Sequence, residues 1–283
     1  TDVVEEILEK TAARFLISSI PIFPDKTNRI DHAGLPDFNG FHWVSNHPKT
    51  TLPVAFDSLG AAFIRFSSGT TGTSKGVLLT HTAIVERTDA ADRALKITSS
   101  DTILWVLSMS FHFVVSILLF LRRGATICLC SEQFPFSFLS AVAKGDSTFV
   151  YATPFHYQTL VENKSVDPDC LKTIRMAVST AMKLPVETAI GFSNRFGIEL
   201  QEAYGIIEVG LPFVNSAVTK AVGSVGQALP DYEVELRNLD EAGIGEVFLR
   251  GPGMYAAYLH PWSPREPSEW FATGDTGRID EKG

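Results

Sequence analysis

A run of small hydroxyl residues and glycines, Ser67–Gly76 (SSGTTGTSKG), is the segment best suited to bind phosphate. This composition lets backbone N–H groups approach phosphate oxygens, and Lys75 adds a mobile positive charge. A Walker A loop would require Gly-Lys-Ser/Thr, whereas here a serine precedes Lys75 and a glycine follows it. We therefore predict a phosphate loop of another type, with a flexible polar turn as the alternative.

The same segment resembles the phosphate-loop signature of the acyl-adenylate-forming superfamily. Acyl-CoA synthetases, beetle luciferases and the adenylation domains of peptide synthetases belong to it. Three later segments resemble further motifs of this family in the family's order: Gln201–Glu208 (QEAYGIIE), Gly245–Tyr258 (GEVFLRGPGMYAAY) and Glu269–Gly277 (EWFATGDTG). The resemblance covers Ala62–Gly283 and, more faintly, the first helix and strand.

The resemblance implies that the loop binds ATP and that Lys75, Thr70 and Thr71 take part in catalysis. No protein nucleophile is required, because the substrate's own carboxylate attacks the α-phosphate. The rate would come from positioning and charge stabilisation. The loop residues that the resemblance places on the nucleotide are Ser67, Ser68, Gly69, Thr70, Thr71, Gly72 and Lys75.

In the second motif, the resemblance implies that Tyr204 packs on adenine and that Glu208 helps to hold Mg²⁺. An aromatic face suits a base, and a hard carboxylate oxygen suits Mg²⁺ that bridges phosphates. Glu202, Ala203 and Gly205 would complete the cofactor-binding stretch.

The second motif departs from the family pattern at Ile207, which stands where a threonine would offer its hydroxyl to the adenylate phosphate. Losing one donor to a developing charge can cost a few kcal/mol of transition-state stabilisation, on the order of 2–4 kcal/mol. We therefore expect either a slower enzyme or a binding module, with Ile207 lining the cofactor site.

Two further segments complete the implied nucleotide site. Asp275 matches the aspartate that accepts hydrogen bonds from both ribose hydroxyls, a task for an ionised, acceptor-only group. Val178–Pro185 (VSTAMKLP) resembles the loop that flanks the adenine opposite the tyrosine, with Ala181 and Met182 at its centre. Met182 could equally fill the core.

His112, in Ser-Phe-His-Phe, resembles the aromatic or histidine gate near the acyl pocket of acyl-CoA and 4-coumarate-type ligases; a satisfied buried histidine is the alternative. Peptide-synthetase domains place an aspartate near this point to pair with an α-ammonium, and no acid occurs from Thr102 through Ala125. A buried ammonium without a carboxylate is strongly disfavoured, which argues against an α-amino acid. The pocket from His112 to Gly210 is mostly apolar, so we expect a fatty or aromatic acid beside His112, Ala181, Gly205 and Gly210.

Apolar strand-like runs alternate with helix-like segments around these residues, which predicts an α/β fold of layered, mostly parallel sheets flanked by helices. Past about Gly223 the pattern changes to short strands and Gly/Pro turns, predicting a small β-rich subdomain near the C-terminal end. The expected strands are Arg14–Ile22, Ala62–Phe66, Ile103–Leu107, Thr126–Cys130, Thr148–Ala152, Met176–Ser179, Glu233–Leu236 and Glu246–Arg250, and the expected helices lie within Thr1–Ile17 and at Thr82–Leu95, Ser137–Ala143 and Val186–Phe196.

Thr102–Leu121 is the one stretch that resembles a membrane span, because it carries no Asp, Glu, Lys or Arg. Five polar residues interrupt it, so we predict a buried strand, turn and helix and no stable membrane span. The net charge of −8 gives no general drive toward nucleic acid. Three cysteines without CxxC spacing suggest neither disulfides nor zinc, and the N-terminal pattern is not a signal peptide, so a cytoplasmic location is expected.

Relative to the family, both ends are short. We expect residues 1–222 to form the nucleotide- and acyl-binding core, with its leading part reduced or absent, and residues 223–283 to form the β-rich subdomain. The small C-terminal domain, which carries a lysine that contacts carboxylate and phosphate, would lie outside this sequence.

The sequence therefore favours an AMP-forming acid–thiol ligase. Its expected cofactors are ATP, Mg²⁺ and either CoA or the phosphopantetheine of a carrier protein. Its expected partners are a small-molecule carboxylic acid and an acyl carrier protein as the alternative acceptor. A catalytically degenerate nucleotide- or acyl-binding module is the second reading, and a P-loop hydrolase the third.

Overall fold

The structure is a computed structural model that describes residues 2–13, 16, 27–29, 42–44, 52–67, 75–130, 134–215, 223–281 and 283. These residues divide into two compact units. The small unit comprises Thr1–Leu78 with Ala257–Pro264, and the large unit comprises Leu79–Ala256 with Arg265–Gly283. The expected strand Arg14–Ile22 falls almost entirely outside the described residues.

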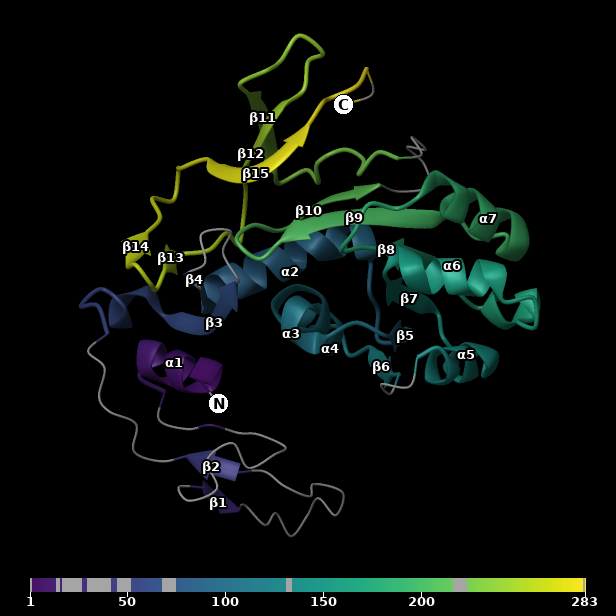
Figure 1. The fold of residues 1–283 in the computed structure, drawn as a ribbon, viewed down its shortest axis with the longest axis horizontal. Coiled ribbons are helices and arrows are strands. Elements are labelled where there is room, and N and C mark those ends of the chain that lie inside the picture. Colours follow the sequence, from purple (N-terminus) through teal and green to yellow (C-terminus); the bar gives the residue numbers. More distant parts are fainter. Residues whose placement is uncertain are drawn as a thin grey trace. The chain divides into compact units, whose positions relative to one another are not determined.

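A six-stranded sheet forms the centre of the large unit, with strand order β10-β9-β8-β7-β5-β6 (Figure 1). Strands β6, β5, β7, β8 and β9 are parallel, and β10 pairs antiparallel with β9. The carboxyl ends of the parallel strands therefore meet at one edge of the sheet, where open α/β folds place their ligands. The strands are β5 (Thr102–Trp105), β6 (Thr126–Leu129), β7 (Phe149–Ala152), β8 (Met176–Ser179), β9 (Leu200–Ile206) and β10 (Gly210–Asn215).

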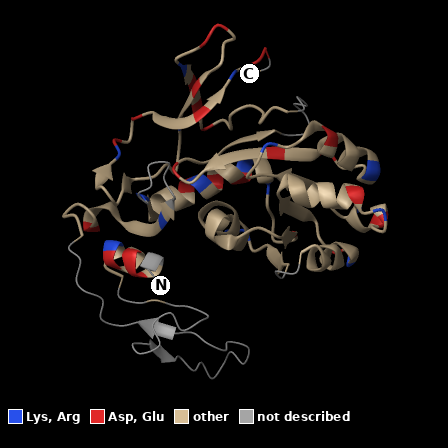
Figure 2. Cartoon of the chain, in the orientation of Figure 1, with Lys and Arg blue, Asp and Glu red and all other residues tan. Residues whose placement is uncertain are grey.

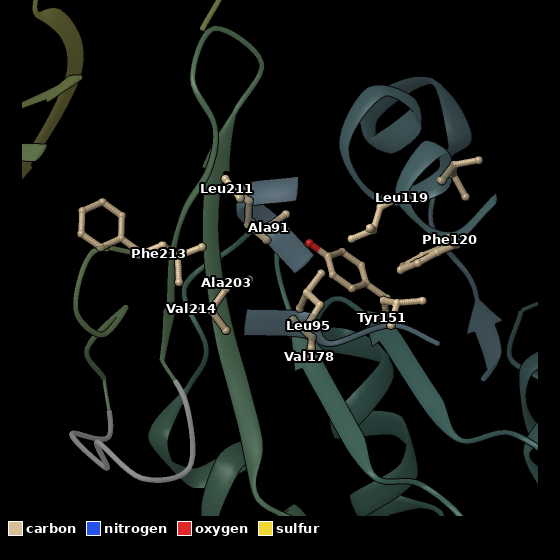
Figure 3. Packing of buried hydrophobic residues seen from close by; sticks show 14 of the residues in the cluster. Ala91, Leu95, Leu119, Phe120, Tyr151, Val178, Ala203, Leu211, Phe213 and Val214 are labelled. Atoms are coloured by element: carbon tan, nitrogen blue, oxygen red, sulfur yellow. The ribbon is translucent and has the colours of Figure 1, made fainter. Parts of the chain in front are cut away.

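Alternation along the strands divides the core of the large unit into two clusters, one on each face of this sheet. Tyr151 points into the first cluster, together with side chains from α2, α4, β8, β9 and β10 (Figure 3). Trp105 belongs to the same cluster. Leu104 and Val150 belong to the second cluster, together with side chains from α5, α6 and α7. Figure 1 shows these three helices beside the sheet. Both faces are covered, which explains why these strands are nearly continuous apolar runs.

Capping residues fix the start of α2 and the end of α7. Thr80 caps α2 by accepting a hydrogen bond from the Ala83 N–H, and Gly197 ends α7 in the left-handed conformation. Acidic and basic side chains are interspersed along α2 (Figure 2). The helices of the large unit are α2 (His81–Leu95), α3 (Met109–His112), α4 (Leu118–Arg122), α5 (Phe136–Ala143), α6 (Pro154–Glu162) and α7 (Val186–Phe196), with a π-helical turn at Phe113–Ile117 and a 3-10 turn at Pro168–Leu171.

A three-stranded antiparallel sheet, in the order β11-β12-β15, completes the large unit. Its strands are β11 (Glu233–Arg237), β12 (Gly245–Arg250) and β15 (Phe271–Gly277). The buried Leu249 and the partly buried Phe271 of this sheet belong to the first core cluster. This sheet is the β-rich element that the Gly/Pro texture predicted, and β15 carries the motif segment with Asp275.

The small unit contains helix α1 (Asp2–Thr11) and a four-stranded sheet in the order β14-β13-β4-β3. Its strands are β3 (Ala61–Ser67), β4 (Lys75–Thr80), β13 (Ala257–Tyr258) and β14 (Ser263–Pro264). A two-stranded pair, β1 (Thr27–Arg29) and β2 (His42–Val44), and a 3-10 turn at Asp57–Leu59 precede this sheet.

Strand β4 corrects the expected order of strand, loop and helix. The sequence pattern predicts that Lys75 and Gly76 end the loop and that the next helix begins at Thr82. Instead, Lys75 and Gly76 open a strand whose residues Val77–Leu79 are fully buried. The apolar run Val-Leu-Leu is too short for a helix face but sufficient for a buried strand.

The stretch Thr102–Leu121 folds as predicted: strand β5 is followed by helical turns α3, Phe113–Ile117 and α4. Within the part of the chain that the structure describes, no helix combines the length and apolar character needed to cross a bilayer.

Candidate nucleotide and acyl site

The hairpin between β9 and β10 carries the residues of the second motif. Strand β9 ends at Ile206, the turn follows at Ile207–Val209, and β10 begins at Gly210. A Cβ on Gly205 would lie 2.4 Å from the Gly210 carbonyl oxygen, and Gly210 has a φ of +108°. Both positions therefore require glycine, because the backbones approach closely at the end of the hairpin.

Tyr204 and Asp275 meet within this site although they lie on different sheets. The Tyr204 hydroxyl donates a hydrogen bond of 2.5 Å to Oδ2 of Asp275. Thr273 holds the aspartate's backbone: its Oγ1 accepts from the Asp275 N–H at 3.0 Å and donates to the Val247 carbonyl at 2.8 Å. An aromatic ring and a carboxylate thus converge at one place, which is the pairing that a base and its ribose need.

The electrostatics at Tyr204 keep its hydroxyl protonated. Burial raises the pKa of Tyr204 well above its ordinary value, the Asp275 carboxylate raises it further, and the negative charge of Glu208 acts in the same direction. The ring itself is only partly buried, with Phe213 packed edge-on at 5.7 Å between centroids. Tyr204 is therefore a stable hydrogen-bond donor whose ring is still accessible.

Glu208 lies in the hairpin turn, and its carbonyl oxygen accepts a 2.8 Å hydrogen bond from the Tyr255 N–H. Mg²⁺ in nucleotide sites is commonly held by one or two protein carboxylates, with waters and phosphate oxygens as the other ligands. A single carboxylate such as that of Glu208 fits this pattern. Among the described residues, no three His, Cys, Asp or Glu side chains gather in a cluster that could hold a metal on its own. Glu208 is then the side chain that would hold it.

The loop after β8 places Ala181 and Met182 at the surface. Ala181 adopts the left-handed conformation, with φ +70°, and Met182 is 60% exposed. Core filling, the alternative for Met182, is therefore excluded. Glu202 of β9 stabilises this loop: its buried carboxylate accepts a 2.9 Å hydrogen bond from the Leu184 N–H.

Two residues of the expected cofactor-binding stretch have side chains inside the fold. Burial raises the pKa of Glu202, although the Leu184 N–H lowers it in part. The Ala203 side chain lies in the first core cluster. Neither side chain is free to contact a nucleotide, so contact at these positions would be through the backbone.

His112 ends helix α3, just beyond the carboxyl end of β5. Its ring packs edge-on against Trp105 at 5.6 Å and against Tyr151 at 5.8 Å between centroids. His112 is partly exposed, whereas Trp105 and Tyr151 are buried. A π-helical turn follows directly, a feature found frequently at functional sites. The aromatic surroundings suit the wall of an apolar pocket.

Most of the expected phosphate loop lies outside the described residues, including Ser68, Gly69, Thr70, Thr71 and Gly72. Ser67 is the last residue of β3. Lys75 is the first residue of β4, and its ammonium lies over the ring of Tyr258 at 5.2 Å from the centroid.

One residue that connects two motif segments carries no recognisable signal in the sequence. Arg87 of α2 is fully buried and donates hydrogen bonds to the carbonyls of Ile207 and Gly253. Its neighbour Glu86 accepts a 3.0 Å hydrogen bond from the Gly253 N–H. In the sequence, Arg87 looks like one more charge on a mixed helix face, and nothing in the pattern marks it as buried.

This chain resembles a family of known proteins over most of its length. The family model described as AMP-binding enzyme matches residues 2–259. Over 232 residues the chain is 31% identical to the 3-[(3aS,4S,7aS)-7a-methyl-1,5-dioxo-octahydro-1H-inden-4-yl]propanoyl:CoA ligase of Mycobacterium tuberculosis, a match that covers 78% of this chain and 45% of the relative. Over 263 residues it is 30% identical to 4-coumarate--CoA ligase 3 of Arabidopsis thaliana, covering 84% and 46%.

Solved structures share the fold. A malonyl-CoA ligase determined as a ternary product complex with methylmalonyl-CoA and AMP superposes with a TM-score of 0.76 at 23% identity, covering 99% of this chain and 62% of that structure. A benzoate CoA ligase from Burkholderia xenovorans LB400 superposes with a TM-score of 0.68 at 24% identity, covering 85% and 50%. This chain spans less than half the length of the two curated relatives above. The chain belongs to the AMP-binding enzyme family, the acyl-adenylate-forming superfamily.

Proposed function

We propose that this protein activates a small carboxylic acid as its acyl-adenylate, at the expense of ATP, and transfers the acyl group to a thiol. The observation that carries the proposal is the hydrogen bond between Tyr204 and Asp275, since it unites a base-stacking ring with a ribose-binding carboxylate. Glu208 follows four residues after Tyr204, in the turn of the same hairpin. This arrangement supports the nucleotide roles that the motifs imply.

In the proposed reaction, a carboxylate oxygen of the acid attacks the α-phosphorus of ATP. The new P–O bond forms as the bond to pyrophosphate breaks, and pyrophosphate leaves. Tyr204 and Asp275 would orient the adenosine, Glu208 would hold Mg²⁺, and Lys75 with Thr70 and Thr71 would stabilise charge on the phosphates. Mg²⁺, when bound, would supply neutralisation of the phosphate charge.

The second step would release the acyl group to a thiol. The sulfur attacks the acyl carbon, the bond to AMP breaks, and the thiol proton passes to solvent. CoA and the phosphopantetheine of a carrier protein offer the same thiol chemistry. The relatives named as CoA ligases favour CoA as the acceptor.

For the acid, we propose a fatty or aromatic substrate placed beside His112, Ala181, Gly205 and Gly210. The packing of His112 against Trp105 and Tyr151 supports an apolar pocket wall. The absence of any acid from Thr102 through Ala125 argues against a substrate with a free α-ammonium group.

The test is pyrophosphate exchange into ATP by the full-length protein with a panel of fatty, aromatic, dicarboxylic and amino acids. Exchange that depends on a fatty or aromatic acid is the expected result, whereas exchange driven best by an amino acid would contradict the substrate class. Ile207, which lacks the expected hydroxyl, favours the second candidate, a degenerate binding module. That candidate predicts tight AMP binding with no exchange for any acid.

A further inference from the structure

The guanidinium of Arg87 connects helix α2 to two motif segments at once. Its Nε donates to the Gly253 carbonyl at 2.7 Å, its Nη2 donates to the same oxygen, and its Nη1 donates to the Ile207 carbonyl at 2.9 Å. The side chain has no exposed surface. One planar group therefore holds the Ile207–Glu208 turn and the Gly251–Gly253 turn at a fixed separation.

The second turn is itself tightly constrained. Gly253 has a φ of +67°, and a Cβ there would lie 2.5 Å from both the Ala83 carbonyl oxygen and the backbone nitrogen of Arg87. A Cβ on Gly251 would lie 2.2 Å from the Tyr232 ring. The Glu86 carboxylate accepts a hydrogen bond from the Gly253 N–H. Glu86 and Arg87, two consecutive residues of α2, therefore bind both the backbone N–H and the carbonyl of this glycine. The turn is thus a rigid anchor for Arg87.

Burying the charged Arg87 side chain costs desolvation free energy, which an apolar side chain in the same place would not cost. Burial lowers the pKa of Arg87 to about 10, and electrostatic interactions with Tyr232 and Glu208 oppose this shift. The group therefore remains charged at neutral pH, next to the residue that would hold the metal. An apolar residue could fill the same space without desolvating a charge, but it could not donate to the Ile207 carbonyl.

We propose that Arg87 is a positioning residue for the metal-binding part of the site: its fork between the Ile207 and Gly253 carbonyls fixes the turn that carries Glu208. The proposal rests on the proposed function. Tyr204 and Asp275 are held independently, by the pairing of β9 with β10 and by the Thr273 hydrogen bonds. Loss of the fork should therefore weaken binding that depends on Mg²⁺ and spare binding that does not.

The test is calorimetric titration of the full chain and its Arg87→Lys variant with two probes, AMP in EDTA and ATP with excess Mg²⁺. Lysine keeps the positive charge near Glu208 but cannot span both carbonyls, so the variant isolates geometry from charge. We expect ATP affinity in Mg²⁺ to fall at least tenfold while AMP affinity stays within about twofold. Arg93→Lys, on the same helix and paired with Asp231 at the surface, is the matched control and should change neither affinity.

Glu86→Ala provides a second variant, at an exposed position that tolerates a smaller side chain better than the buried Arg87 does. It frees the Gly253 N–H and should give a smaller loss of the same selective kind. A parallel fall of both affinities in Arg87→Lys, in step with its thermal midpoint, would show a merely structural role and overturn the proposal. Unchanged ATP affinity of Arg87→Lys in Mg²⁺ would also overturn the proposal. If Arg87→Lys does not fold, Glu86→Ala decides: the proposal is overturned when that variant shows no selective loss of Mg²⁺-dependent ATP binding. Wild-type chain that binds neither probe would instead refute the proposed function.

Discussion

The Tyr204 hydroxyl and the Asp275 carboxylate share a 2.5 Å hydrogen bond across 71 residues of sequence. Tyr204 lies in the mixed sheet and Asp275 in the antiparallel one, so the bond joins the two layers at the proposed nucleotide site. It also orders the carboxylate before any ribose arrives. One oxygen of Asp275 is occupied by tyrosine, and the other, with its remaining acceptor capacity, is available to hydroxyl groups.

The two residues should differ in what they contribute to AMP binding. Tyr204→Ala removes the ring and should lower AMP affinity by about fivefold to about 150-fold, the equivalent of about 1–3 kcal/mol of base stacking. Tyr204→Phe keeps the ring and should lower it about threefold or less. Isothermal titration of the folded variants measures both. Equal losses in the two variants would show that the hydroxyl, and not the ring, carries the interaction.

Asp275→Asn should weaken AMP binding by about tenfold or more, because an amide cannot accept hydrogen bonds from two ribose hydroxyls and Tyr204 as an ionised carboxylate does. 2′,3′-Dideoxy-AMP provides the control ligand. This ligand lacks both ribose hydroxyls, so it should bind the wild type weakly. Its affinity for Asp275→Asn should be nearly the same as its affinity for the wild type. If the variant binds AMP as tightly as the wild type does, Asp275 is not the ribose ligand.

Lys75→Ala should weaken ATP binding more than AMP binding, by about tenfold, because AMP lacks the outer phosphates that a mobile ammonium would reach. The Lys75 ammonium lies over the Tyr258 ring, a contact worth about 0.5–1 kcal/mol, which a phosphate can readily replace. Titrations with both nucleotides measure the difference. Lys164→Ala, at an exposed turn, is the matched control. Equal effects on AMP and ATP would place Lys75 away from the outer phosphates.

Much of the fold could be predicted from local patterns. The buried runs Phe149–Ala152 and Met176–Ser179 have no polar alternation, which is typical of strands covered on both faces. Helix α7 was predicted with its observed bounds, since its apolar spacing ends at a glycine. Strands β4, β9, β10 and β15 were not assigned as strands, because motif residues interrupt their apolar patterns.

The site was predictable only where a motif names a residue. Tyr204, Glu208 and Asp275 stand in recognisable order, and the structure brings Tyr204 and Asp275 together. Arg87 could not be found in this way, since its partners are backbone carbonyls 120 and 166 residues away. A backbone acceptor leaves no residue type in the sequence to indicate the contact.

Asp101 should be the main acid-sensitive group at the opposite end of the sheet. It is 3% exposed and accepts hydrogen bonds from Arg175, Thr98 and Thr148, and the Arg175 guanidinium holds the pKa of this carboxyl well below its usual range. Asp101→Asn should therefore lower the free energy of unfolding by about 2–4 kcal/mol at pH 7. Urea unfolding measures the change.

The pH dependence follows from the sign of that pKa shift. Because the folded-state pKa is depressed, the stability is present above the unfolded value of about 4 and is lost progressively as pH falls from that value toward the depressed folded-state pKa. Asp101→Asn should flatten this acid slope. Asp89→Asn, in a half-exposed surface pair with Arg123, should cost less than about 1 kcal/mol and leave the slope unchanged. An unaltered slope in Asp101→Asn would assign the acid sensitivity to other carboxylates.

Ile207→Thr should raise adenylation turnover in the full-length protein without changing ATP affinity. The Ile207 carbonyl is held by Arg87, so the backbone that presents the side chain stays in place whichever residue occupies it. In the proposed site, ground-state binding would depend on Tyr204, Asp275 and Glu208, which the substitution leaves intact. The added hydroxyl would act where phosphate charge rearranges, which affects rate more than affinity.

The expected gain is about tenfold in turnover for each ~1.4 kcal/mol of transition-state stabilisation recovered. Single-turnover formation of acyl-AMP measures it, and Ile206→Thr, one residue earlier at the end of β9, is the matched control that should show no gain. If turnover stays flat, either Thr70 or Thr71 already serves that oxygen or the chain only binds nucleotide. Thr70→Ala and Thr71→Ala separate these outcomes, because only an enzyme that uses one of those hydroxyls can lose further activity.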